Sequence, residues 1–157
     1  MSKRAEMEIA RKLMKKRLTL AVAESCTGGL LSSTLTDVPG SSKWFKGGVV
    51  AYTNEVKKRI LGVKTATLRK YGAVSEETAI EIAKGVRKKL KTDIGISITG
   101  LAGPGGGTKK TPVGTIFVGV DDGKETLVRR LELKGSRVKI KRDAVGLAIK
   151  ILQKFIK

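Results

Sequence analysis

The segment Leu18–Leu35 reads LTLAVAESCTGGLLSSTL, and it sets the class of the fold. It begins with a short apolar run, Leu18–Ala23, of the kind that forms a strand buried inside a sheet. A polar turn with two adjacent glycines, Glu24–Gly29, follows, and residues 29–35 are expected to be helical. A strand, a glycine turn and a helix in this order indicate an α/β protein, and such a turn often binds an anion. No Gly-Lys-Ser or Gly-Lys-Thr follows, so the turn is not a P-loop.

Strands and helices continue to alternate along the rest of the chain. Further helices are expected at 5–16, 54–61, 75–90 and 137–155, and further strands at 47–53, 93–99, 113–120 and 125–133. A hairpin turn at Asp121–Gly123 joins the last two strands. Residues 41–46 allow at most one helical turn, and residues 65–72 are expected to be irregular. We therefore expect a single domain over residues 1–157, an α/β three-layer sandwich with a mixed sheet flanked by helices.

Length and hydropathy favour a cytoplasmic protein. The chain has 157 residues, of which 40% are hydrophobic, enough for a real core. No apolar run approaches the roughly 20 residues that span a bilayer, so no membrane partner is expected. The charged start, Met1–Glu6, lacks the apolar centre of a signal peptide.

The chain is strongly basic. Lys and Arg number 33 and Asp and Glu 14, a formal charge of 33 − 14 = +19. Nucleic acid is one partner that this charge suits, but the lysines are scattered and aromatic residues make up only 4% of the chain. We therefore expect nucleic acid to be a secondary partner. One Asn and one Gln among many charged residues are also typical of a thermostable protein.

The absence of histidine excludes whole classes of site. With no His and one Cys, a Ser-His-Asp triad, a Cys-His pair and a His-ligated zinc site cannot form. The acids are few and dispersed, so no metal site and no cofactor are expected. A hydrolase with this composition must take its base from Lys, Glu, Asp or Tyr.

Several residues that could do chemistry also have ordinary structural explanations. Taken alone, Ser42 fits a turn cap, Lys57 a solvated helix face, Tyr52 half-buried packing and Cys26 a small core residue. The glycine-rich loop is more specific, since Gly100–Gly107 holds five glycines in eight residues directly after a strand. We expect this loop and the segment from Glu24 to Lys57 to form one ligand pocket.

Six short motifs in one order resemble the CinA C-terminal domain, the nicotinamide-nucleotide amidohydrolase family, in its stand-alone form. The resemblance extends from the first strand to the last helix. The motifs are Ala23–Gly29, Pro39–Ser42, Tyr52–Asn54 with Lys57 and Leu61–Val63, Gly72–Ser75, Thr99–Pro104 and Pro112–Thr115. Two positions depart from the family pattern: Thr53 replaces a common serine and Thr111 a common lysine.

The resemblance implies deamidation of nicotinamide mononucleotide to nicotinate mononucleotide and ammonia, without a metal or cofactor. It implies that Ser42 is the nucleophile, that Lys57 is the general base and that Tyr52 assists. A Ser-Lys pair works only with a neutral lysine, which burial or neighbouring cations favour. A homo-oligomer is expected from the resemblance alone.

The same resemblance suggests which residues bind the substrate. A basic residue near the last helix is expected to join them, and Arg137 and Arg142 both fit, with Arg137 preferred. The full set is Glu24, Ser25, Thr27, Gly28, Gly29, Thr99, Gly100, Gly103, Arg137 and Arg142. Two other functions stay open at this point, a nucleotide-binding module without turnover and a basic nucleic-acid-binding protein.

Overall fold

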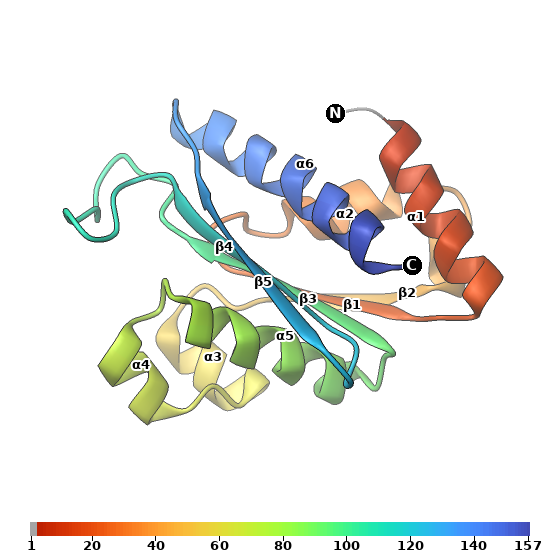
Figure 1. Ribbon diagram of the computed structural model, residues 1–157, viewed down its shortest axis with the longest axis horizontal. Helices are drawn as coiled ribbons and strands as arrows, with labels where there is room; N and C mark the ends of the chain where they lie inside the picture. Colours follow the sequence, from red (N-terminus) through yellow and green to blue (C-terminus); the bar gives the residue numbers. More distant parts are fainter. Residues whose placement is uncertain (1–2) are drawn as a thin grey trace.

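The computed structural model describes residues 3–157 and contains six α-helices, one 3₁₀ turn and five strands (Figure 1). In chain order they are α1 (Lys3–Lys16), β1 (Leu20–Glu24), α2 (Leu30–Thr36), η1 (Ser41–Lys43), β2 (Phe45–Val50), α3 (Asn54–Leu61), α4 (Thr65–Tyr71), α5 (Glu76–Leu90), β3 (Ile94–Gly100), β4 (Thr115–Asp121), β5 (Thr126–Glu132) and α6 (Arg137–Phe155). None of the helices within residues 3–157 is long and apolar enough to cross a bilayer.

The five strands form one mixed sheet in the order β2-β1-β3-β4-β5. The strand β1 lies between β2 and β3 and is parallel to both, so Glu24 stands beside Val50 on one side and Ile98 on the other. The strands β4 and β5 add to β3 as antiparallel partners. The predicted α/β architecture with a mixed sheet is confirmed.

Helices cover both faces of the sheet, which gives the expected three layers. Figure 1 shows α1, α2 and α6 on one face and α3, α4 and α5 on the other. The larger apolar core lies under α1, α2 and α6, and a smaller one of Ala, Leu, Val and Ile side chains lies under α3 and α5. Burial of these two helix stripes against the sheet is the main stabilising term of the fold.

The prediction for residues 65–72 is wrong, because residues 65–71 form the helix α4. Its N-cap, Lys64, makes no side-chain cap bond, so the local sequence gives little helix signal. The helix is held instead by Glu81 of α5, whose carboxylate accepts hydrogen bonds from the backbone N–H of Lys64 (2.8 Å) and from Thr67 Oγ1 (2.7 Å). A tertiary contact has replaced the missing local cap.

A glycine fixes how closely α5 approaches the end of α3. A Cβ atom at Gly85 would lie 2.0 Å from the carbonyl oxygen of Leu61, which real side chains do not tolerate. The small residue therefore lets α5 pack directly on α3, the helix that carries Lys57.

Replacing Gly85 with alanine is expected to destabilise the protein. Alanine improves intrinsic helix propensity by about 1 kcal/mol, but the clash with Leu61 forces the helices apart and outweighs it. The melting temperature should fall by roughly 3–10 °C in thermal unfolding. Gly105→Ala is the control, since no atom lies within 4 Å of its Cβ position. A Gly85→Ala protein as stable as the wild type would contradict this account of the packing.

Candidate active site

The carboxyl ends of the three parallel strands meet at one edge of the sheet. The strand β1 ends at Glu24, β2 at Val50 and β3 at Gly100. Loops that leave the carboxyl ends of neighbouring parallel strands are where open α/β sheets place their ligand sites. The predicted residues Ser25, Tyr52 and Thr99 lie in or next to these strand ends and are brought to the same edge.

A buried lysine and a buried serine form the centre of this edge. Lys57 Nζ donates hydrogen bonds to Ser25 Oγ (3.1 Å) and to the carbonyl oxygen of Ala51 (2.8 Å). The side chains are hidden from solvent, with Lys57 2% exposed and Ser25 8% exposed. Burial lowers the pKa of Lys57, while the nearby Cys26 opposes that shift. The neutral amine, which accepts a proton, is therefore favoured more than in a free lysine.

Local sequence places Lys57 correctly on its helix. Thr53 is the N-cap of α3, and its side chain accepts a hydrogen bond from the N–H of Val56 (3.3 Å). The helix thus starts shortly after the end of β2, and the amine of Lys57, one turn later, reaches Ser25 Oγ and the carbonyl oxygen of Ala51. An N-cap threonine four residues ahead of the lysine is a signal that the sequence does carry.

Ser42, which the family resemblance suggested as the nucleophile, does not meet Lys57 in the structure. It is exposed and lies in η1, before β2 begins, whereas Lys57 follows the end of that strand. Six strand residues separate the two ends of β2, a rise of roughly 20 Å. The partner of Lys57 is Ser25, which sequence reasoning placed only among the substrate-binding residues. The signal for Ser25 was its position directly after a central strand, at the first residue of a glycine turn.

Glu24 was expected to bind substrate, but its carboxylate serves the fold. It is buried and accepts hydrogen bonds from the N–H of Leu31 (2.9 Å), the N–H of Ser32 (2.8 Å) and Ser32 Oγ (2.9 Å). Alternation along the strand turns Glu24 toward α2 and Ser25 toward α3. Glu24 therefore anchors the turn that carries Ser25 without facing Lys57.

Glu24→Gln should destabilise the fold, because the amide NH₂ cannot accept the hydrogen bonds that the lost oxygen received. We expect a loss of about 2–4 kcal/mol in the free energy of unfolding, measured by urea denaturation at neutral pH. Glu55→Gln removes an equal charge from a well-exposed i,i+4 pair with Arg59 and should change stability by less than about 0.5 kcal/mol. Similar stability of the two variants would show that the three bonds of Glu24 contribute little.

The glycine-rich loop is tied to this edge by Arg137, the first residue of α6. Its guanidinium donates one hydrogen bond to the carbonyl oxygen of Gly103 and another to Tyr52 Oη (2.8 Å). Arg137 thus links the glycine-rich loop to the segment from Glu24 to Lys57, while the single ligand pocket expected from the sequence stays a prediction. Tyr52 is 57% exposed, so its ring stands at the mouth of the site and is not packed in the core. Arg142, the alternative to Arg137, lines a different cavity, between α1 and α6.

The remaining predicted residues lie in the turn that follows Ser25 or at the carboxyl end of β3. Thr99 is buried and donates to the carbonyl oxygen of Ala73 (2.8 Å), which joins β3 to the loop before α5. The hydroxyl of Thr27 is buried and has no hydrogen-bond partner within residues 3–157. Gly28 and Gly29 have positive φ angles of 62° and 97°, so the turn that follows Ser25 needs glycine. Gly100 leaves no room for a Cβ against Thr115 and Ile116, which gives it a packing role.

Cys26, next to Ser25, is poorly suited to nucleophilic attack. Burial raises the pKa of its thiol to about 11, so the thiol stays protonated at neutral pH. Ser25 and Lys57 are therefore better candidates than Cys26 for a nucleophile and a base at this edge.

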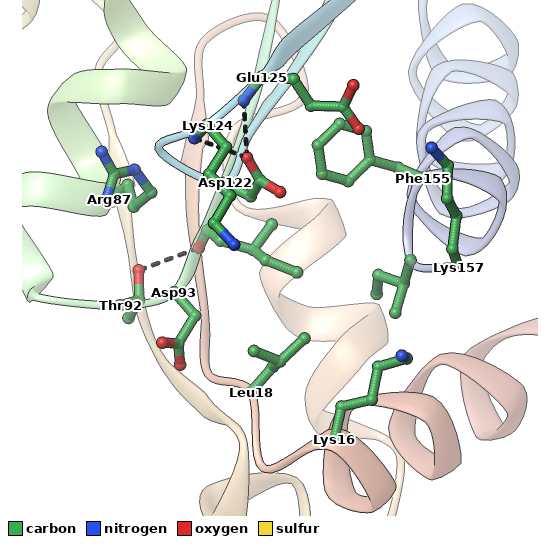
Figure 2. A pocket seen from close by; sticks show the side chains of 12 residues that line it. Lys16, Leu18, Arg87, Thr92, Asp93, Asp122, Lys124, Glu125, Phe155 and Lys157 are labelled. Atoms are coloured by element: carbon green, nitrogen blue, oxygen red, sulfur yellow. Dashed lines mark hydrogen bonds between the residues drawn. The ribbon is translucent and has the colours of Figure 1, made fainter.

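A cavity of about 450 Å³ lies away from this site (Figure 2). It is lined by residues such as Leu18, Asp93, Asp122 and Phe155, which come from the opposite end of the sheet. None of the predicted site residues borders it. Within residues 3–157, no three Asp, Glu, Cys or His side chains are grouped so that they could hold a metal ion.

Known proteins of one family are similar to this chain over nearly its whole length. The family model described as "CinA C-terminal domain" matches residues 2–156. A competence-damage inducible protein of Thermoanaerobacter sp. (strain X514) is 51% identical over 153 residues, covering 96% of this chain and 37% of that protein. A CinA-like protein of Thermotoga sp. (strain RQ2) is 47% identical over 152 residues, again with 37% of its length covered. The chain thus spans little more than a third of the curated relatives that it matches.

Solved structures resemble the whole chain. The competence or damage-inducible protein of Enterobacter asburiae superposes with a TM-score of 0.94 at 35% identity, covering 98% of this chain and 96% of that one. A CinA superfamily protein of Klebsiella pneumoniae 700603 gives the same TM-score and coverage at 31% identity. The match of the family model over nearly every residue, together with these relatives, shows that this chain belongs to the CinA C-terminal domain family.

Proposed function

We propose that this chain is an amidohydrolase that converts nicotinamide mononucleotide and water to nicotinate mononucleotide and ammonia. The observation that supports the proposal is the hydrogen bond between Lys57 Nζ and Ser25 Oγ, made by a buried lysine whose pKa is lowered. A serine becomes a nucleophile when an adjacent base takes its proton, and a neutral lysine is such a base. The chain holds no histidine that could compete for this role.

In the first half of the reaction, Ser25 Oγ attacks the carboxamide carbon and Lys57 Nζ takes the hydroxyl proton. The carbonyl π electrons move to the oxygen, which gives a tetrahedral intermediate. The C–N bond then breaks as the Lys57 ammonium returns its proton to the departing nitrogen, and ammonia leaves. An ester between Ser25 and the nicotinoyl group remains.

In the second half, water attacks that ester while Lys57 again accepts a proton. Collapse of the second intermediate releases the carboxylic acid, and the proton on Lys57 returns to Ser25 Oγ. The oxyanion of both intermediates needs hydrogen-bond donors fixed in advance. The N–H groups of Thr27 and Gly29 donate to no acceptor within residues 3–157 and are our candidates for this role.

The identity of the substrate rests on the family resemblance. A pyridine carboxamide supplies the bond that a Ser-Lys pair can cleave, and the exposed ring of Tyr52 stands beside the site as a surface for a flat ligand. Tyr52 is also positioned by Arg137, and we propose that the two residues together orient the substrate.

The direct test is to incubate the purified protein with nicotinamide mononucleotide and to measure ammonia and nicotinate mononucleotide. We expect the two products in equal amounts from the wild type. We expect neither product from a Ser25→Ala protein whose fold has been verified by a thermal unfolding measurement. Binding of the nucleotide without any release of ammonia would favour a nucleotide-binding module and overturn the proposed hydrolysis.

A further inference from the structure

A lysine that sequence reasoning did not select lies against the turn after Ser25. Lys141 is in the second turn of α6, and a Cβ atom at Gly28 would lie 3.8 Å from its Nζ. The side chain is half-buried. Within residues 3–157, its amine has no hydrogen-bond acceptor and no carboxylate within 4.0 Å. Lys139, on the same helix, shows the contrast, since it pairs with Asp143.

Arg137 adds a second cation on the same face of α6. Residues i and i+4 of a helix are neighbours, so Arg137 and Lys141 lie on the same face of α6, next to the turn that follows Ser25. The two acceptors of Arg137, Gly103 O and Tyr52 Oη, are uncharged, and none of the salt bridges within residues 3–157 compensates its charge. Glu24, which directly precedes Ser25, already accepts three hydrogen bonds from α2, and Asp143, the acid nearest to Lys141 in sequence, pairs with Lys139.

Two uncompensated cations beside a nucleophile form a site for an anion. Phosphate suits both, because arginine and lysine donate strong charge-assisted hydrogen bonds to its oxygens. The buried, unpartnered hydroxyl of Thr27 lies in the same turn and offers one more donor. Val50 is 49% exposed and lies 3.6 Å from the Cβ position of Gly29, which gives the turn an apolar surface for the uncharged part of a ligand.

We propose that Lys141 determines specificity by binding the phosphate of the substrate together with Arg137. The inference rests on the proposed function, because it names how the same site would select a phosphorylated carboxamide over an unphosphorylated one. Lys141 does not touch the reacting bond. Its removal should therefore weaken binding of the nucleotide and leave the chemical step intact.

The test compares two substrates that differ only by the phosphate, nicotinamide mononucleotide and nicotinamide riboside. Lys141→Gln should lower kcat/KM for the mononucleotide by roughly 10- to 100-fold, mainly through KM, and leave the value for the riboside unchanged. Lys141→Arg should restore most of the loss. Lys150→Gln, an exposed position farther along α6, is the matched control and should affect neither substrate. Equal losses on the two substrates, or no loss on the mononucleotide, would overturn the proposal.

A binding measurement separates this inference from the proposed function. In a Ser25→Ala background, calorimetric titration with nicotinamide mononucleotide should give a Kd that Lys141→Gln raises by the same factor. If the wild type releases no ammonia, hydrolysis is refuted while this titration still decides the role of Lys141. An unchanged Kd in the Lys141→Gln protein would refute the phosphate contact, whatever the activity.

Discussion

Ser25→Ala is expected to lower kcat/KM for nicotinamide mononucleotide by roughly 10³- to 10⁶-fold, the range seen when a hydrolase loses its nucleophile. The reason is that Ser25 supplies the one hydroxyl, among the residues that the structure describes, to which the buried Lys57 amine is hydrogen-bonded. Ammonia release under saturating and limiting substrate would measure the loss, and thermal unfolding would verify the fold. Removing one small hydroxyl should leave the melting temperature nearly unchanged.

Ser42→Ala is the matched control for this prediction, because it removes the same atom from an exposed position at the other end of β2. Its activity should stay within about twofold of the wild type, a barrier change of less than about 0.5 kcal/mol. Cys26→Ser should also remain active, since the thiol is protonated at neutral pH. A loss of activity in Ser42→Ala as large as in Ser25→Ala would restore Ser42 as the nucleophile.

Replacing Lys57 should be as damaging as replacing Ser25. Lys57→Arg keeps the positive charge but cannot accept a proton, and Lys57→Met keeps most of the apolar volume without an amine. Both should lower kcat/KM by about 10³-fold or more. Lys58→Met, at an exposed position on the same helix, should be nearly silent. Near-normal turnover by Lys57→Arg would show that Lys57 supplies only charge.

The pH dependence follows from the direction of the Lys57 pKa shift. Burial lowers this pKa from its ordinary value of 10.5, and only the neutral amine can act as the base. The logarithm of kcat/KM should therefore rise with unit slope as the pH increases and become flat above the pKa of Lys57. Activity should fall as the pH decreases below this pKa, because protonated Lys57 has no lone pair with which to accept a proton. A profile that stays flat down to the lowest pH at which the protein remains folded would contradict this role.

Local sequence determined most of the fold. The apolar run of β1, the glycine turn after it and the N-cap serine of α5 each act within a few residues, so their effects could be read without tertiary information. The helix at residues 54–61 was predicted to the residue, because its N-cap Thr53 and its terminal Gly62 both mark it. The helix α4 lacked such marks and required Glu81 of a neighbouring helix.

The sequence by itself also determined that any catalytic base must be a residue other than histidine, and the family motif indicated Lys57 as the candidate. Which serine that lysine meets was decided only by the tertiary structure. Ser25 and Ser42 stand in similar small-residue turns, and nothing local distinguishes them. The order of the strands distinguishes the two serines, because β1 lies between β2 and β3 and runs parallel to both. That arrangement puts Ser25 at the same edge of the sheet as α3, while the length of β2 carries Ser42 to the other. Contacts between residues 32 apart in the chain depend on strand order and direction, which no short stretch of sequence encodes.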